Sequence, residues 1–337
     1  MNFIKNIFWN SVQSRLRAGW RIFFHLILLG MMTLLSQVVV VGVALIFNAP
    51  PAGADIDRLI LFVNELIGKS PVFVVGVIAL SGLSIIASVW LAGKWFDHRA
   101  FKGFGMQLDG RWWRDFIFGL MLGAVLMSLI FAVENAAGWV TITGTMVAGA
   151  NATFAEAFLI QVVAFAFVGV YEELWSRGYQ LTNLAEGMNQ PKIGQKWAVI
   201  IAWLVSSLVF GFLHLGNPNA TLVSTFNIFL AGLFLALPYV LTGNLGASIG
   251  IHFTWNLFQG MVFGFPVSGT TTSTTVIAIQ QGGPELWTGG LFGPEAGLIG
   301  IAAILLGCGL TLLWVRWQYG KIEFNAGLGE YSKRGDA

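Results

Sequence analysis

Charged residues are scarce in this chain of 337 residues, since Lys, Arg, Asp and Glu together make up only 10% of it. A soluble domain carries about a quarter charged residues, because its surface must be wetted by water. Cysteine is scarcer still, and the single Cys308 excludes both a disulfide framework and a cluster of metal-binding thiolates. The sequence also shows no internal repeat, which argues against a transporter built from duplicated halves. These shortages leave an integral membrane protein as the class that fits.

Apolar residues are abundant in the chain: 56% of the residues are hydrophobic, and the mean hydropathy is +0.75. A helix that crosses a bilayer needs about 20 predominantly apolar residues. Eight stretches meet this requirement: 20–47, 72–95, 115–137, 154–175, 197–215, 221–241, 245–265 and 296–317. We therefore predict an all-α polytopic membrane protein, a bundle of about eight transmembrane helices.

Lys and Arg are distributed unevenly between the two sides of these spans. Sixteen of the eighteen fall on the side of the N-terminus, and only Arg58 and Lys69 fall on the other. Cytoplasmic segments carry the excess of positive charge in membrane proteins. The distribution predicts that both termini are cytoplasmic (N-in and C-in), which requires an even number of spans.

The chain divides into four parts with no soluble domain between them. Residues 1–19 repeat an apolar side chain every four positions among basic ones, which predicts an amphipathic helix on an anionic membrane surface. A frayed basic tail would give the same composition. The remaining parts are the first three spans and their loops (20–153), a core that carries the polar motifs (154–270), and an external loop with the last span and tail (271–337).

An ionisable residue inside a span costs several kcal/mol, so it is a functional hypothesis by default. The fourth span ends in Glu172, Glu173 and, four residues later, Arg177. On a helix Glu173 and Arg177 lie one turn apart and can pair, while Glu172 points about 100° away and stays available for proton transfer. A simpler interpretation is that both glutamates only mark the cytoplasmic end of the helix.

Histidines occupy two further spans, His214 in the fifth and His252 in the seventh. Asn256 follows His252 by four residues, so both share one helix face and can donate hydrogen bonds to a developing oxyanion. Taken singly, each histidine is more often a packed, hydrogen-bonded helix residue than a catalyst. Together with the glutamate pair on a third span, they predict a site.

The motifs, in order, are Glu-Glu-x-x-x-Arg at 172–177, Phe-x-x-x-His at 210–214 and His-x-x-x-Asn at 252–256. In this order on separate membrane helices they resemble the CPBP family, which contains the type II CAAX prenyl endopeptidases and bacterial Abi or bacteriocin-immunity proteins. The longer strings at 210–219 and 252–260 also look like bacterial members.

The resemblance implies an intramembrane endopeptidase. Glu172 would be the base that activates water, His214 would position that water, and His252 with Asn256 would stabilise the tetrahedral intermediate, while the remaining glutamate and arginine orient the site. It further implies a membrane-associated protein or peptide as substrate, which can be lipidated, and the bacterial plasma (inner) membrane as location. The lipid bilayer is the other expected partner, and we expect no nucleic acid to bind.

A zinc-dependent version of the same peptidase competes with this interpretation, because the family has also been described as metallopeptidases. Glu172, His214 and His252 would then be the ligands. We favour a mechanism without a cofactor, because the sequence has no His-Glu-x-x-His spacing and three ligands from three helices would need further support. Two functions of a different class also compete: a non-catalytic immunity or partner-binding protein on the same fold, and a proton-coupled transporter.

The depth of the site in the bilayer is the remaining difficulty. At about 1.5 Å per residue, His214 lies near the outer end of its span, whereas Glu172 lies near the inner end if its span stops at 175. The two side chains would then be too far apart to hold one water. Either the fourth helix continues past Arg177 toward Gly187, or the fifth span begins well below the membrane surface.

Overall fold

The computed structural model describes residues 7–48, 53–149 and 152–331. Seven of its helices are long and apolar enough to cross a membrane: Ala18–Ile46, Phe73–Asp97, Gly110–Ala136, Phe154–Met188, Gln195–Gly216, Leu222–Thr242 and Leu298–Tyr319. The prediction of an all-α polytopic membrane fold is confirmed.

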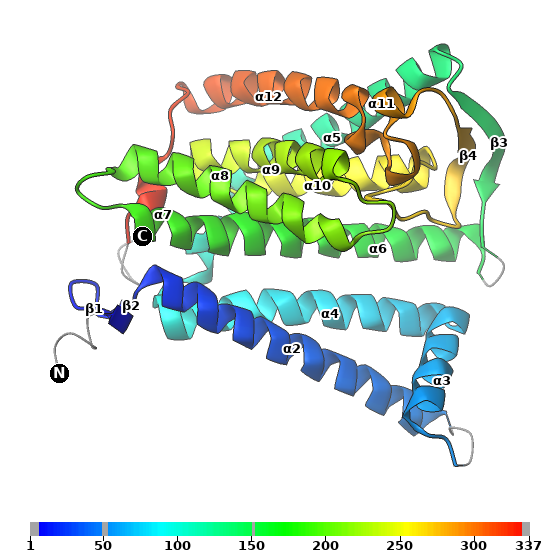
Figure 1. The fold of residues 1–337 in the computed structure, drawn as a ribbon, viewed down its shortest axis with the longest axis horizontal. Coiled ribbons are helices and arrows are strands. Elements are labelled where there is room, and N and C mark those ends of the chain that lie inside the picture. Colours follow the sequence, from blue (N-terminus) through cyan, green and yellow to red (C-terminus); the bar gives the residue numbers. More distant parts are fainter. Residues whose placement is uncertain (1–6, 49–52, 150–151, 332–337) are drawn as a thin grey trace.

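The helices within these spans keep the labels of Figure 1. They are α2 (Ala18–Phe47), α4 (Pro71–Ala92), α5 (Gly110–Ala136), α6 (Phe154–Glu173), α7 (Thr182–Met188), α8 (Gln195–Leu213), α9 (Leu222–Thr242) and α12 (Leu298–Tyr319). Capping side chains fix where several begin; for example, Thr153 and Glu156 form a reciprocal capping box at the start of α6.

The predicted span 245–265 is a helix of another kind. It consists of α10 (Gly246–Asn256), followed without a break by the π-helix η5 (Leu257–Val262). Most of its side chains are buried by neighbouring helices rather than exposed to lipid. It runs beside the longer helices as an inner helix, and it carries His252 and Asn256 (Figure 1).

The helices run roughly parallel, and the two ends of the bundle differ (Figure 1). α2 and α4 lie side by side, and α4 packs on α6. The described chain begins and ends at the same end, where the guanidinium of Arg15 lies 3.4 Å from the ring centroid of Tyr331. This placement fits an even number of crossings, and which side of the membrane the two ends occupy stays a prediction.

The opposite end of the bundle carries a small sheet. β3 (Val140–Val147) pairs antiparallel with β4 (Thr275–Gln281), with a register shift between Ile142 and Gly144. Gln281 in β4 donates a hydrogen bond to the buried carboxylate of Glu134 at the end of α5, 2.9 Å away. Also at this end are α3 (Ile56–Lys69), α11 (Glu285–Thr288) and the short 3-10 turns η4 (His214–Gly216), η6 (Gly290–Phe292) and η7 (Pro294–Ala296).

The predicted amphipathic helix before α2 is wrong for residues 9–16, which form a hairpin of β1 (Trp9–Asn10) and β2 (Arg15–Leu16). The Asn10 side chain accepts hydrogen bonds from the backbone of Val12 and Gln13 and so favours a turn. Residues 1–6 lie outside the described residues, and the membrane-surface location of the segment stays a prediction.

A buried group of ion pairs lies where the hairpin meets the bundle. The carboxylate of Glu186 in α7 accepts from Arg15, from Arg21 in α2 and from Arg99, and Arg21 also pairs with Asp97 at 2.7 Å. Asp97 ends the π-helix η1 (Gly93–Asp97), and η2 (Phe101–Phe104) follows it; η8 (Ala326–Gly329) lies near the C-terminus. We call Arg15, Arg21, Asp97, Arg99 and Glu186 the Glu186 cluster; it joins the first segment, α2, the end of α4 and α7.

α5 and α10 approach closely because each presents two glycines four residues apart. These are Gly119 and Gly123 in α5, facing Gly246 and Gly250 in α10. Small residues at this spacing let helix backbones come into contact in membranes. A Cβ atom placed on Gly123 would lie 2.5 Å from the carbonyl oxygen of Ile251. The position of His252, the next residue, therefore depends on this glycine contact.

Candidate active site

The fourth span is longer than predicted, and this resolves the difficulty of depth. α6 continues through the π-helix η3 (Leu174–Leu181) into α7, so one uninterrupted helix of 35 residues runs from Phe154 to Met188. The predicted end at 175 is wrong, because the apolar side chains of η3 pack into the bundle. Glu172 thus lies near the middle of the helix rather than at its end. Single-turn π segments occur often at functional sites.

The two adjacent carboxylates have different surroundings, as the sequence predicted. Glu173 is fully buried, and its Oε1 atom accepts from Arg177 at 3.0 Å, one turn further along the chain. The Glu172 side chain is 26% exposed and faces a cavity. Glu173 is therefore a paired, structural charge, and Glu172 is the carboxylate that can reach a ligand.

Arg177 is held on three sides. Besides pairing with Glu173, it donates to the carbonyl oxygen of Gly232 at 3.1 Å. Its guanidinium carbon lies 4.3 Å from the ring centroid of Phe210, in cation–π contact. Phe210, the first residue of the second motif, thus packs against the ion pair of the first motif and joins α8 to η3.

His252 lies between the two glutamates. Its Nδ1 atom is 2.8 Å from Glu173 Oε1, and its Nε2 atom is 3.9 Å from Glu172 Oε2. Because the carboxylate of Glu173 is paired with Arg177 and can only accept, Nδ1 of His252 is the donor in their contact. The ring is thereby fixed with its other nitrogen toward Glu172 and the cavity.

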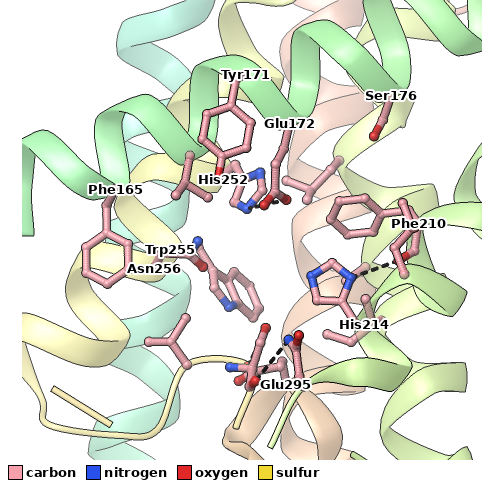
Figure 2. Close-up of a pocket in the computed structure, with 18 of the residues that line it drawn as sticks. Phe165, Tyr171, Glu172, Ser176, Phe210, His214, His252, Trp255, Asn256 and Glu295 are labelled. Atoms are coloured by element: carbon pink, nitrogen blue, oxygen red, sulfur yellow. Dashed lines mark hydrogen bonds and ion pairs between the residues drawn. The ribbon is translucent and has the colours of Figure 1, made fainter. Parts of the chain in front are cut away.

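His214 lies across the cavity from Glu172, at the end of α8 (Figure 2). Its Nδ1 atom donates to the backbone carbonyl of Phe210 at 2.8 Å, since a carbonyl can only accept. In the neutral ring this leaves Nε2 with a free lone pair. His214 can therefore accept a hydrogen bond from a water or a ligand in the cavity.

Glu172, His214 and His252 line one cavity of about 870 Å³, whereas the Glu173–Arg177 pair lies outside its lining. Asn256 also lines it, one turn after His252, as the spacing predicted. Figure 2 shows Glu172 and His252 on one side, His214 across from them, and Asn256 beside Trp255. The structure thus brings together a carboxylate, two oriented imidazoles and a primary amide from three helices.

The three residues considered as zinc ligands lie around the cavity, and whether catalysis needs a metal stays a prediction. Within the residues that the structure describes, no three His, Cys, Asp or Glu side chains are grouped so that they can hold a metal ion. Of the ligands considered for zinc, His252 binds Glu173 and His214 binds a backbone carbonyl through Nδ1, and both leave Nε2 toward the cavity. Glu172, His214 and His252 share the cavity without forming a ligand set.

Comparison with known families gives one match. Residues 154–258 match the family model described as type II CAAX prenyl endopeptidase Rce1-like. This part of the chain is similar to that family. No curated protein and no solved structure matches the chain. The match agrees with the resemblance that the three motifs carry, and the family it describes is one of prenyl endopeptidases.

The matched residues 154–258 include all six predicted site residues, but the cavity extends beyond them. Thr270, Thr271 and Thr272, which precede β4, line the cavity, as does Glu295 from η7 (Figure 2). Glu295 accepts from the backbone of Ser268 at 2.6 Å and from the amide of Gln259. Sequence reasoning missed Glu295, because a single glutamate in a Gly-rich segment between two spans carries no local signal.

Proposed function

We propose that the protein is an intramembrane endopeptidase that hydrolyses a peptide bond of a membrane-associated or lipidated protein with a water activated by Glu172. The observation that supports this most is the division of labour between the adjacent carboxylates. Glu173 is bound by Arg177 and His252, whereas Glu172 is free to face His214 and Asn256 across the cavity. A protein that only binds a partner does not need an unpaired base that faces hydrogen-bonding groups held in fixed orientations.

The first step is attack by water on the substrate carbonyl carbon. Nε2 of His214 accepts one hydrogen bond from the water and so orients it, and Glu172 takes the other proton as the C–O bond forms. The carbonyl oxygen becomes an oxyanion, which the amide group of Asn256 and Nε2 of His252, when protonated, stabilise as donors. No Asn256 hydrogen bond to another described side chain competes with this role.

The second step is collapse of the tetrahedral intermediate. The C–N bond breaks, and the proton held by Glu172 passes to the leaving amine, which restores the Glu172 carboxylate. The products are a new carboxyl group and a new amine. Throughout, the buried pair of Glu173 and Arg177 keeps its charges and holds the His252 ring in place.

The decisive variant is Glu172→Gln, which keeps the size of the side chain and removes the base. Membranes from cells with wild-type protein should contain cleaved polypeptides that are absent with Glu172→Gln, as measured by proteomic mapping of new N-termini. Glu323→Gln is the control, because Glu323 is exposed and distant from the cavity. A binding or immunity protein would keep its phenotype in Glu172→Gln, and that outcome would refute the proposal.

We further propose that catalysis needs no metal. Purified protein should keep its peptidase activity after exhaustive chelation. Loss of activity that only added zinc restores would overturn this part of the proposal, and it would leave the role of Glu172 to be tested by the variant above.

We also propose that both chain ends face the cytoplasm of a bacterial cell. The excess of Lys and Arg on the side of the termini supports this, as does the contact between Arg15 and Tyr331, which places both ends together. Reporter fusions at each end should both show cytoplasmic activity. A periplasmic signal from either fusion would contradict the orientation.

A further inference from the structure

The cavity continues from Glu172 along the π-helix η3, where two polar side chains face it. Ser176 follows Glu172 by one turn and Gln180 by two, and both line the cavity. Ser176 is only 1% exposed, and its Oγ atom has no hydrogen-bond partner in the described part of the chain. The Oε1 atom of Gln180 is likewise buried without a partner. Buried polar atoms are normally hydrogen-bonded, so each of these needs an explanation.

The opposite part of the cavity shows a different pattern. There Ser268 donates from its backbone to Glu295, Thr272 donates to the carbonyl of Gly260 at 3.2 Å, and Asn217 donates to the carbonyl of Ser268 at 3.1 Å. Those polar groups hold a loop in place. By contrast, Oγ of Ser176 and Oε1 of Gln180 bond to no group in the described part of the chain. Figure 2 shows Ser176 on the same helix as Glu172.

The two groups match the chemistry of an extended peptide backbone. A serine hydroxyl can donate to a carbonyl, and a glutamine Oε1 can accept from an N–H group. At about 1.5 Å per helical residue, Ser176 and Gln180 lie roughly 6 Å and 12 Å along the helix from Glu172. An extended peptide advances about 3.3 Å per residue, so these distances span about two and four substrate residues.

We propose that Ser176 and Gln180 form a subsite that binds the substrate backbone about two and four residues from the scissile bond. The substrate would lie extended along η3, on the side of the cavity that leads toward α7. This inference rests on the proposed peptidase function and adds the direction in which the substrate runs.

Ser207 offers a matched control for Ser176. It is also 1% exposed, and its Oγ atom also lacks a hydrogen-bond partner, but it lies on α8 away from the cavity lining. Ser176→Ala, Gln180→Leu and Ser207→Ala would be assayed with a fluorescence-quenched peptide that spans a cleavage site mapped with Glu172→Gln. One lost hydrogen bond corresponds to a fall in kcat/KM of about three- to tenfold. We expect this fall in the first two variants, mainly through KM, and a change below about twofold in Ser207→Ala.

Peptides shortened or N-methylated on one side of the cleavage site then locate the contact. The effect of Gln180→Leu should vanish for a peptide that lacks the N–H group about four residues from the scissile bond. Equal behaviour of Ser176→Ala and Ser207→Ala, or an unchanged effect of Gln180→Leu on the methylated peptides, would overturn the subsite. Absence of any Glu172-dependent cleavage would overturn the peptidase function itself, and with it the subsite.

Discussion

The glycine contact between α5 and α10 determines where His252 and Asn256 lie, and Gly123→Ala tests this directly. The new Cβ atom would lie 2.5 Å from the carbonyl oxygen of Ile251 and 2.9 Å from the backbone nitrogen of Trp255. Ordinary contacts of a Cβ atom begin at 3.4 Å. Both neighbours are backbone atoms that cannot rotate away, so α10 has to move outward by roughly 1 Å to restore normal packing.

The expected cost has two parts. Overpacking of a helix contact destabilises a fold by about 1–3 kcal/mol. A displacement of about 1 Å in groups that contact the reacting atoms costs roughly 100-fold in rate. Gly123→Ala should therefore lose most of its activity while it lowers the melting temperature only by several degrees, because the rest of the bundle stays packed.

The assay is peptidase activity of the purified variant beside its thermal unfolding in the same detergent. Gly309→Ala in α12 is the control, because a Cβ atom there meets nothing within 4 Å. It should match the wild type in both measurements. If Gly123→Ala keeps activity within about threefold of the control, then α10 is not positioned by this contact and the reasoning fails.

Three further predictions concern buried charges. Glu173→Gln leaves Arg177 without its ion pair and should destabilise the fold by about 3–5 kcal/mol. Glu323→Gln, in an exposed pair, should leave the melting temperature close to that of the wild type in the same thermal unfolding assay. Glu186→Gln should cost at least as much as Glu173→Gln, because three arginines share that carboxylate; a melting temperature like that of the wild type would contradict the role of the Glu186 cluster. Burial raises the pKa of Glu295 to about 7 from 4.5, so the folded protein binds this proton more tightly than the unfolded chain. The wild type should therefore lose stability relative to Glu295→Gln as the pH rises from about 4.5 to 7, by roughly 3 kcal/mol; a constant difference between pH 4.5 and 8 would show that Glu295 keeps an ordinary pKa.

Local patterns in the sequence predicted much of the fold and of the site. Apolar length is a property of each segment alone, so most of the spans were placed to within a few residues. The pairing of Glu173 with Arg177 followed from their spacing on one helix, and the freedom of Glu172 from its different direction.

Such local patterns could not predict contacts between segments that are distant in the sequence. The bond from His252 to Glu173 joins residues 79 apart in the chain, and it gives His252 an orienting partner that its own helix does not reveal. Arg15 is buried in an ion pair with Glu186, which lies 171 residues away in the chain. The apolar repeat around Arg15 predicted an amphipathic helix and gave no sign of this contact. The apolar run over 245–265 has the composition of a span, but glycine contacts with α5 place it inside the bundle.

The π-helix η3 has a consequence for the length of the chain. It lies between Glu172, which faces the cavity, and Glu186, which faces three arginines at the end of the bundle. Each helical residue turns the chain by about 100°, so the deletion or insertion of one residue in Leu174–Leu181 would rotate one glutamate relative to the other by that angle. Only one of the two could then keep its partners. The number of residues in this segment is therefore as constrained as their identity.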